Sequence, residues 1–203
     1  IDTLLFEDST TYAYKAWQTC ADRDVVVRVL KEKLAKDREF AKKFLYEAAL
    51  AARLRHPGIV SIYDVGKLGN LFYICHAYVE GTTLEKLLTI DKCFPVRESV
   101  KVALSIARAL AHAHEQGVIH RNLTPANVIF TKQGQTVVSE IGIPKRLIET
   151  AEGGLAAAGL LVGSPEFMAP EQIEDYSISD KRSDIFALGA ILYKMIAGQS
   201  LFV

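Results

Sequence analysis

The sequence predicts an α+β fold in which strands dominate the first part of the chain and helices the second. Residues 25–30 form a run rich in valine, which is typical of a strand buried on both faces. Apolar residues recur at helical spacing over 37–54 and again over 95–116. A third apolar helix pattern begins at Ser183. Strands first and helices later indicate an α+β chain.

The first part predicts one helix and a group of strands. The helix over 37–54 ends before the sequence His-Pro-Gly at 56–58. Two further strands are expected over 59–65 and 71–77, joined by a turn at 69–70. The apolar positions that define the helix are Phe40, Phe44, Ala48 and Ala51.

The second part predicts two long helices. One begins at Pro95, a residue that suits the first helical turn, and stops at Gly117. Its expected apolar face consists of Val100, Ala103, Leu104, Ala107 and Leu110. The other helix carries Ile185, Leu188, Ile191, Leu192 and Ile196. Between the two helices, the stretch 152–163 is rich in glycine and alanine and is expected to be flexible.

Composition excludes some classes of partner and location. Lysine plus arginine equals aspartate plus glutamate at 24 each, so no bulk charge indicates nucleic acid or an anionic membrane surface. The three cysteines lack the spacing of a zinc site or a disulfide framework, which suits a reducing compartment. No apolar run approaches the roughly 20 residues that span a bilayer, and no signal segment is present at Ile1. We expect a cytoplasmic chain, either free or the cytosolic part of a larger or membrane-anchored protein.

Ordered motifs give a more specific expectation. Glu47 lies in a helical segment, and it is followed by RHPGIVSIYDVG from Arg55, YVEGTTLEKLL from Tyr78, HRN from His120, APE from Ala169 and SDIFALGAILY from Ser183. In this order and spacing the chain resembles bacterial eukaryotic-like Ser/Thr protein kinases. The resemblance implies a bilobal protein-kinase-like fold, with a small β-rich N-lobe over 1–79 and a mainly helical C-lobe over 80–203. It also implies that the C-lobe is partial, because family domains continue beyond the central helix at 183–198.

The resemblance places altered residues at the catalytic positions. Asn122 stands where the family has its catalytic aspartate, and an uncharged amide is a poor proton acceptor. Thr124 replaces the lysine that helps to neutralise the transferred phosphoryl group. Phe6, Asp8 and Thr11 occupy the positions of the three glycines that cover the ATP phosphates. No catalytic position of the family is therefore expected to be intact.

The nucleotide pocket implied by the resemblance is altered as well. Arg28 replaces the phosphate-binding lysine and is expected to pair with Glu47 as a structural strut. Val26 replaces the alanine above the adenine and would narrow the pocket. His76 falls at the gatekeeper position, where we expect a satisfied core histidine, and Tyr78 follows at the hinge. Together with Asn127, the residues Arg28, Val26, His76 and Tyr78 are the secondary candidates for cofactor binding.

Two residues are candidates for a metal site. Asn127 keeps the family's metal-binding asparagine, and Glu140 stands where the family has a magnesium-binding aspartate. Glutamate is one methylene longer, and magnesium requires near-ideal octahedral distances. A solvated acid at a strand end is the alternative for Glu140. No cofactor is the first expectation, with ATP and magnesium as the secondary one.

Residues that build the family fold are retained. By resemblance, an apolar column between the lobes would contain Ala51, Ile62, His120 and Ile141. Asp184 matches the acid that anchors the catalytic loop through backbone N–H groups. The expected structural residues are His120, Arg121, Glu171 and Asp184.

Three functional hypotheses follow. The first is a pseudokinase without enzyme activity that acts as a regulatory or scaffolding module and binds a protein partner, either an active kinase or another domain of its own polypeptide. Its contact surfaces are expected at 142–171 and beside Glu47. The second is a divergent ATP-binding Ser/Thr kinase, or a kinase-fold enzyme with other nucleotide-transfer chemistry, which would use Arg28, Glu47, Asn127 and Glu140. The third is a half-domain completed by a partner at the uncovered helix 183–198.

Overall fold

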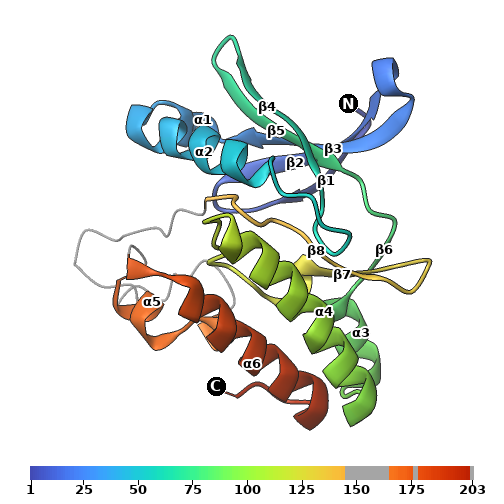
Figure 1. Cartoon of the computed structure of the whole chain (residues 1–203). Helices are drawn as coiled ribbons and strands as arrows, with labels where there is room; N and C mark the ends of the chain where they lie inside the picture. The colour runs from blue at the N-terminus through green and yellow to red at the C-terminus, as the bar shows by residue number, and fades with distance from the viewer. Residues whose placement is uncertain (145–164, 176–177, 202–203) are drawn as a thin grey trace.

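The computed structural model describes residues 1–144, 165–175 and 178–201. The predicted flexible stretch at 152–163 lies outside these residues. In the described parts, no helix is long and apolar enough to cross a membrane. The two parts of the chain form a strand-rich upper half and a helical lower half (Figure 1), which is the protein-kinase-like arrangement that the sequence predicts.

The upper half is a five-stranded antiparallel sheet of order β1-β2-β3-β5-β4 with helix α2 beside it (Figure 1). Strand β3, which contains the predicted valine run, pairs with β2 on one side and with β5 on the other. Helix α2 packs on β4 and β5, and Asp37 caps its first turn by accepting a hydrogen bond from the Phe40 N–H. The elements are β1 (Thr3–Glu7), β2 (Thr11–Gln18), β3 (Arg23–Leu30), α1 (Glu32–Ala35), α2 (Arg38–Ala51), β4 (Ile62–Leu68) and β5 (Leu71–Ala77).

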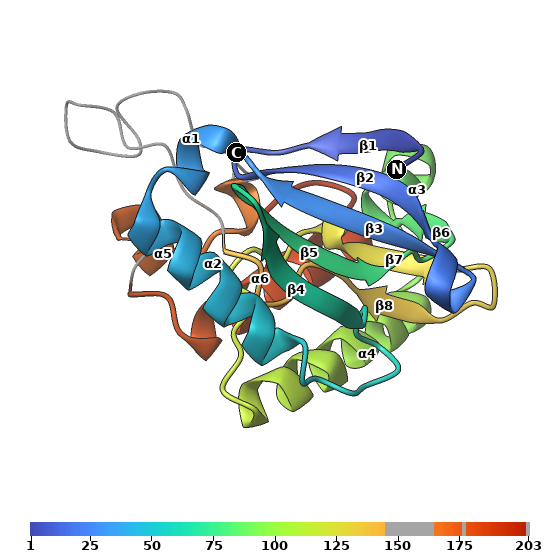
Figure 2. The same cartoon turned by 90° about the horizontal axis from the view of Figure 1, so that it is seen from above.

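The lower half combines a small sheet, β6-β7-β8, with helices that run beneath it. In the view from above, the upper sheet overlies β7 and β8 (Figure 2). Helix α4 packs against α6 and β8. The elements are β6 (Gly81–Thr83), α3 (Leu84–Asp91), α4 (Val96–Glu115), β7 (Val128–Thr131), β8 (Thr136–Val138), α5 (Pro170–Glu174) and α6 (Lys181–Ala197). Short 3-10 turns are η1 (Thr19–Ala21), η2 (Pro125–Asn127) and η3 (Pro165–Phe167).

The structure corrects the predicted start of β4 and the predicted buried face of α4. The strand expected from residue 59 begins at Ile62, because residues 56–61 instead form a loop that bonds β8 through Val60 N and Val138 O. The apolar face predicted for α4 is rotated: Val100 and Leu104 are about half exposed, whereas Val102 and Ile106 are buried. Helix α4 has more small and apolar positions than one face needs, so its pattern alone left the buried side ambiguous.

The larger of two apolar clusters among the described residues joins the halves, and the residues expected to form an apolar column are buried. Ala51 of α2, Ile62 of β4, His120 and Ile141 are all buried. On α6, Ala187, Ile191 and Met195 are buried, whereas Ile185 and Ile196 of the predicted apolar pattern are exposed. The core therefore holds β5, α2, α4 and α6 around the segment that carries the site.

Candidate functional site

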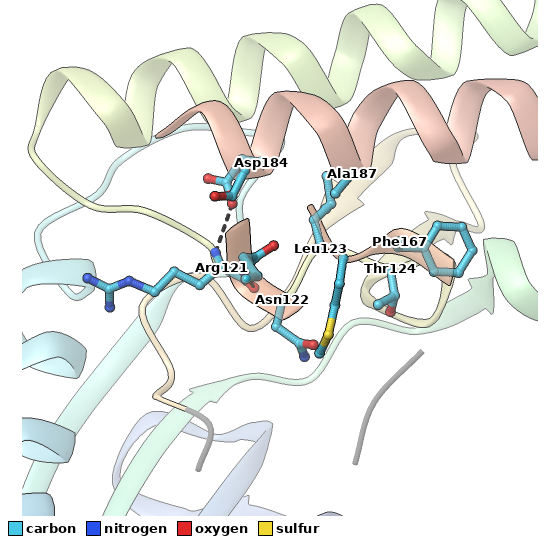
Figure 3. A pocket seen from close by; sticks show the side chains of 10 residues that line it. Arg121, Asn122, Leu123, Thr124, Phe167, Asp184 and Ala187 are labelled. Atoms are coloured by element: carbon cyan, nitrogen blue, oxygen red, sulfur yellow. Dashed lines mark hydrogen bonds between the residues drawn. The ribbon is translucent and has the colours of Figure 1, made fainter. Parts of the chain in front are cut away.

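The loop that follows α4 is fixed by a buried carboxylate. Asp184, at the start of α6, is 1% exposed. Its Oδ2 accepts hydrogen bonds from the His120 N–H at 2.9 Å and from His114 Nε2 at 2.7 Å, and its Oδ1 accepts one from the Arg121 N–H at 2.8 Å. Figure 3 shows the Arg121 bond as a dashed line. Charge-assisted bonds of this kind, buried together, hold the loop backbone in one position.

Asn122 and Thr124 line a pocket between this loop and α6 (Figure 3). The Asn122 carbonyl accepts a hydrogen bond from Asn127 Nδ2 at 2.8 Å, which connects η2 to the loop. An amide at residue 122 offers an oxygen to a substrate hydroxyl, but it carries no negative charge. The pocket is lined by Arg121, Asn122, Leu123, Thr124, Phe167, Met168, Gln172, Ser183, Asp184 and Ala187.

Arg121 joins three helices. Its side chain extends away from Asn122 (Figure 3) and its Nη1 donates to Glu47 Oε2 of α2 at 2.7 Å. Its backbone carbonyl accepts from Gln172 Nε2 of α5 at 2.8 Å, while its N–H donates to Asp184 of α6. Its φ of +62° is in the left-handed region, which these contacts stabilise.

Gln172 was missed by the sequence analysis. It is 2% exposed, and its Oε1 also accepts from the Ala169 N–H at 3.1 Å. A glutamine directly after the Ala-Pro-Glu motif was the available signal, because a buried amide must find partners on both its oxygen and its nitrogen. Glu171 is held differently: its Oε1 accepts from the Ser183 hydroxyl at 2.8 Å.

The expected ion pair between Arg28 and Glu47 is wrong. Arg28 is fully buried on β3 and its guanidinium contacts the carboxylates of Asp8 and Glu140. Glu47 instead contacts Arg121, with Lys43 at 3.9 Å. The guanidinium is wider than an ammonium and presents its donors in a fork, so it reaches two carboxylates, one in the first hairpin and one after β8.

His76 and Val26 are cross-strand partners on β5 and β3, on the sheet face that also carries Arg28. His76 Nδ1 lies 3.0 Å from the Ala77 carbonyl oxygen, which assigns the proton to Nδ1. Its buried Nε2 has no hydrogen-bond partner in the described part of the chain, so His76 is not the satisfied core histidine that we expected. Burial, and then the positive charge of Arg28, lower the pKa of His76 to about 4. At the hinge, the Lys15 ammonium lies 4.6 Å from the centre of the Tyr78 ring.

One of the two candidate metal ligands is already engaged in this arrangement. Glu140, at φ +65°, accepts from the Arg28 guanidinium with its Oε1, whereas Asn127 donates its amide nitrogen to the Asn122 carbonyl and keeps its amide oxygen, the atom that would bind a metal. Among the described residues, no group of three or more His, Cys, Asp or Glu side chains is placed to hold a metal ion. Magnesium prefers several oxygen ligands at octahedral positions. Asn127 and Glu140 would therefore hold magnesium only together with oxygens from a nucleotide or from water.

Comparison with known proteins decides the family. The family model described as "Protein kinase domain" matches residues 8–203. The chain belongs to the protein kinase family. It is 38% identical, over 94% of its length, to a probable serine/threonine-protein kinase of Clostridium acetobutylicum, and 34% identical over 93% to the serine/threonine-protein kinase PrkC of Bacillus subtilis. It spans 28% of the length of each of these relatives.

A solved structure of the same family has the same fold. The kinase domain of PknI from Mycobacterium tuberculosis superposes with a TM-score of 0.77 at 26% identity, covering 97% of this chain and 73% of that one. These findings confirm the bacterial eukaryotic-like Ser/Thr kinase resemblance and the bilobal fold. They contradict the expectation that the chain is not an enzyme, because relatives matched over most of this kinase domain are named as Ser/Thr protein kinases. The substitutions at 122, 124 and 140 alter the family's catalytic positions, but they do not by themselves show that activity is lost.

Proposed function

We propose that this chain is a divergent ATP-binding Ser/Thr protein kinase domain, which transfers the terminal phosphoryl group of ATP to a protein hydroxyl. The observation that carries the proposal is the intact support of the catalytic loop: Asp184 holds the backbone of His120 and Arg121, and Asn127 holds Asn122. Catalysis of phosphoryl transfer depends mainly on positioning and electrostatics. The relatives named as Ser/Thr protein kinases support the same reaction class.

Asn122 would orient the substrate hydroxyl through its amide oxygen. Because the transition state of phosphoryl transfer is loose, the hydroxyl proton need not be removed before the phosphoryl group begins to move. The missing aspartate still has a cost, since general-base catalysis commonly contributes about 10²–10⁴-fold. Thr124 lowers the rate further, because it brings no positive charge to the transferred phosphoryl group. We therefore expect a slow kinase.

The test is a direct assay of phosphoryl transfer. The purified chain would be incubated with radiolabelled ATP, with and without magnesium, and with a serine- and threonine-rich protein substrate, and phosphorylated residues would be mapped by mass spectrometry. An Asn122→Ala/Asn127→Ala double variant controls for a contaminating kinase, since it removes the groups that position the hydroxyl. Label above this control supports the proposal. Equal label in both samples refutes it.

A second candidate function is regulation through protein contact, which does not require loss of catalysis. It would act through α6, where Ile185 is 55% and Ile196 40% exposed among the described residues. Apolar groups in such a patch favour association. An Ile185→Ser/Ile196→Ser variant that fails to co-purify with a partner captured by the parent chain, at unchanged stability, would support this role. Equal capture by both chains would contradict it.

A further inference from the structure

The Arg28 guanidinium connects the first hairpin to the turn after β8. Its Nε donates to Thr11 Oγ1 at 3.0 Å and its Nη2 to the same oxygen at 2.7 Å. Its Nη2 also contacts Asp8 Oδ2, and its Nη1 contacts Glu140 Oε1. The side chain of Arg28 is fully buried, whereas Asp8 retains 20% exposure and Glu140 11%. Two carboxylates thus share one buried guanidinium.

Asp8 has a second set of contacts within its own turn. Its Oδ1 accepts hydrogen bonds from the Thr10 N–H at 2.8 Å and the Thr11 N–H at 2.7 Å. The Asp8 N–H in turn donates to the Thr11 carbonyl at 3.0 Å. One oxygen of the Asp8 carboxylate therefore accepts from two backbone N–H groups, and the other contacts the Arg28 guanidinium.

These donors are the groups that bind oxyanions in general. Successive backbone N–H groups of a turn form a concave anion site, and a guanidinium matches the two oxygens of a carboxylate or a phosphate. A phosphate oxygen presented to this hairpin would need the positions that the Asp8 oxygens now hold. It would also meet Coulomb repulsion from Asp8 and Glu140. Nucleotide phosphates and the Asp8 side chain therefore compete for the same donors.

We propose that Asp8 is an internal stand-in for a phosphate group, which fills the oxyanion site of Arg28, Thr10 and Thr11 and thereby sets the nucleotide affinity of this domain. The inference rests on the proposed function only for its ligand, a nucleoside triphosphate. When a phosphate enters, the Asp8 carboxylate leaves towards solvent, which its 20% exposure allows. Glu140 stays on Nη1 and keeps the guanidinium in place.

The sign of one mutational effect separates this proposal from a purely structural role. If Asp8 only braces the hairpin, removing its charge loosens the site and weakens nucleotide binding. If Asp8 competes with phosphate, removing its charge strengthens binding. Asp8→Asn retains the size of the side chain and an oxygen for the Thr10 and Thr11 N–H groups, and it removes the charge that holds Arg28.

The experiment is isothermal titration of ATP and, separately, of inorganic pyrophosphate, into the parent chain and Asp8→Asn, each with and without magnesium. Glu7→Gln is the matched control, because it removes one negative charge from the neighbouring residue, whose ion pair with Lys31 is exposed. We expect affinity for both ligands to rise about 10-fold or more in Asp8→Asn. We expect Glu7→Gln to bind as the parent does.

Each outcome decides the proposal. Unchanged or weaker binding by Asp8→Asn overturns it, and so does an equal gain in Glu7→Gln. Pyrophosphate binding gained in Asp8→Asn without phosphoryl transfer in any sample supports the oxyanion site and refutes the proposed kinase function. No binding of either ligand by any variant refutes both. If thermal unfolding shows that Asp8→Asn is not folded, Asp8→Ser serves in its place, because a serine hydroxyl also accepts from the turn N–H groups.

Discussion

Glu47 of α2 contacts Arg121 of the catalytic loop, with 2.7 Å between Oε2 and Nη1. This pair links the helix of the upper half directly to the loop that positions Asn122. Arg28, the cation that the sequence assigned to Glu47, is held by Asp8 and Glu140 instead. The upper half is thus connected to the lower half by two separate ion-pair systems.

Double-mutant cycles should detect the first of these systems. The free energy of unfolding of Glu47→Gln, Arg121→Gln and the double variant should show a coupling of about 0.5–1 kcal/mol, since both side chains are partly exposed to solvent. The matched cycle with Glu47→Gln and Arg28→Gln should show coupling below about 0.3 kcal/mol. Urea unfolding measures both. A larger coupling for Glu47 with Arg28 than with Arg121 would contradict the arrangement.

Among the acidic residues, removal of Asp184 should lower the free energy of unfolding the most. Asp184→Ala leaves two backbone N–H groups and His114 without their buried acceptor, and we expect about 3–5 kcal/mol of lost unfolding free energy. Asp180→Ala, four residues earlier, removes the cap of α6 and should cost only about 1 kcal/mol. Chemical denaturation measures the unfolding free energy of both variants. Similar losses in the two variants would show that the anchor contributes no more than a cap.

Gln172 should be a positioning residue of the catalytic loop. Gln172→Leu leaves the Arg121 carbonyl and the Ala169 N–H unpaired, and it should lower the unfolding free energy by about 1–3 kcal/mol. Gln172→Glu keeps the acceptor for Ala169 but loses the donor to Arg121, so it isolates the contact with the loop. In phosphoryl-transfer assays both variants should lower kcat more than they raise KM for ATP. A change in KM alone would point to the nucleotide site instead.

His76 should make stability depend on pH. Its pKa in the folded chain is about 4, below the ordinary 6.5, so the unfolded chain binds more protons between these values. Unfolding free energy should therefore be at its full value above pH 6.5 and fall as the pH decreases towards 4, by on the order of 1–3 kcal/mol. His76→Leu should flatten this slope in urea unfolding from pH 4 to 7. His56, whose pKa is lowered by burial and by His112, contributes a residual slope of the same sign. If the slope is unchanged in His76→Leu, another titratable group causes the pH dependence of the unfolding free energy.

Restoring the catalytic carboxylate should accelerate the reaction. Asn122→Asp supplies a general base at the loop position that Asn127 and Asp184 support, and kcat should rise by about 10²-fold or more. Asn122→Ala is the control, and it should be slower than the parent because no group orients the hydroxyl. ATP affinity should be similar in all three chains, because these substitutions do not change the hydrogen-bond donors around Arg28 that would bind the ATP phosphates. An Asn122→Asp chain no faster than the parent would show that another step limits the rate.

The sequence by itself determined the type of the main elements and indicated the family, because short stretches of residues display both. The valine run of β3 and the turn between β4 and β5 depend on neighbouring residues only. The ordered motifs around His120, Ala169 and Ser183 likewise lie in short stretches that sequence alone displays. The substitutions at Asn122, Thr124 and Glu140 are evident from the sequence for the same reason, since each lies inside or beside one of these short motifs.

The tertiary structure decided which charges meet. Asp8, Arg28 and Glu140 are separated by 20 and 112 residues, so no short stretch of sequence displays their proximity. Their pairing depends on side-chain direction and on distances within an ångström, because Coulomb and hydrogen-bond energies change steeply at contact. The same reason explains why Gln172 was missed and why Glu47 was assigned the wrong partner: the family pattern predicts which residues are present, and only packing selects their contacts.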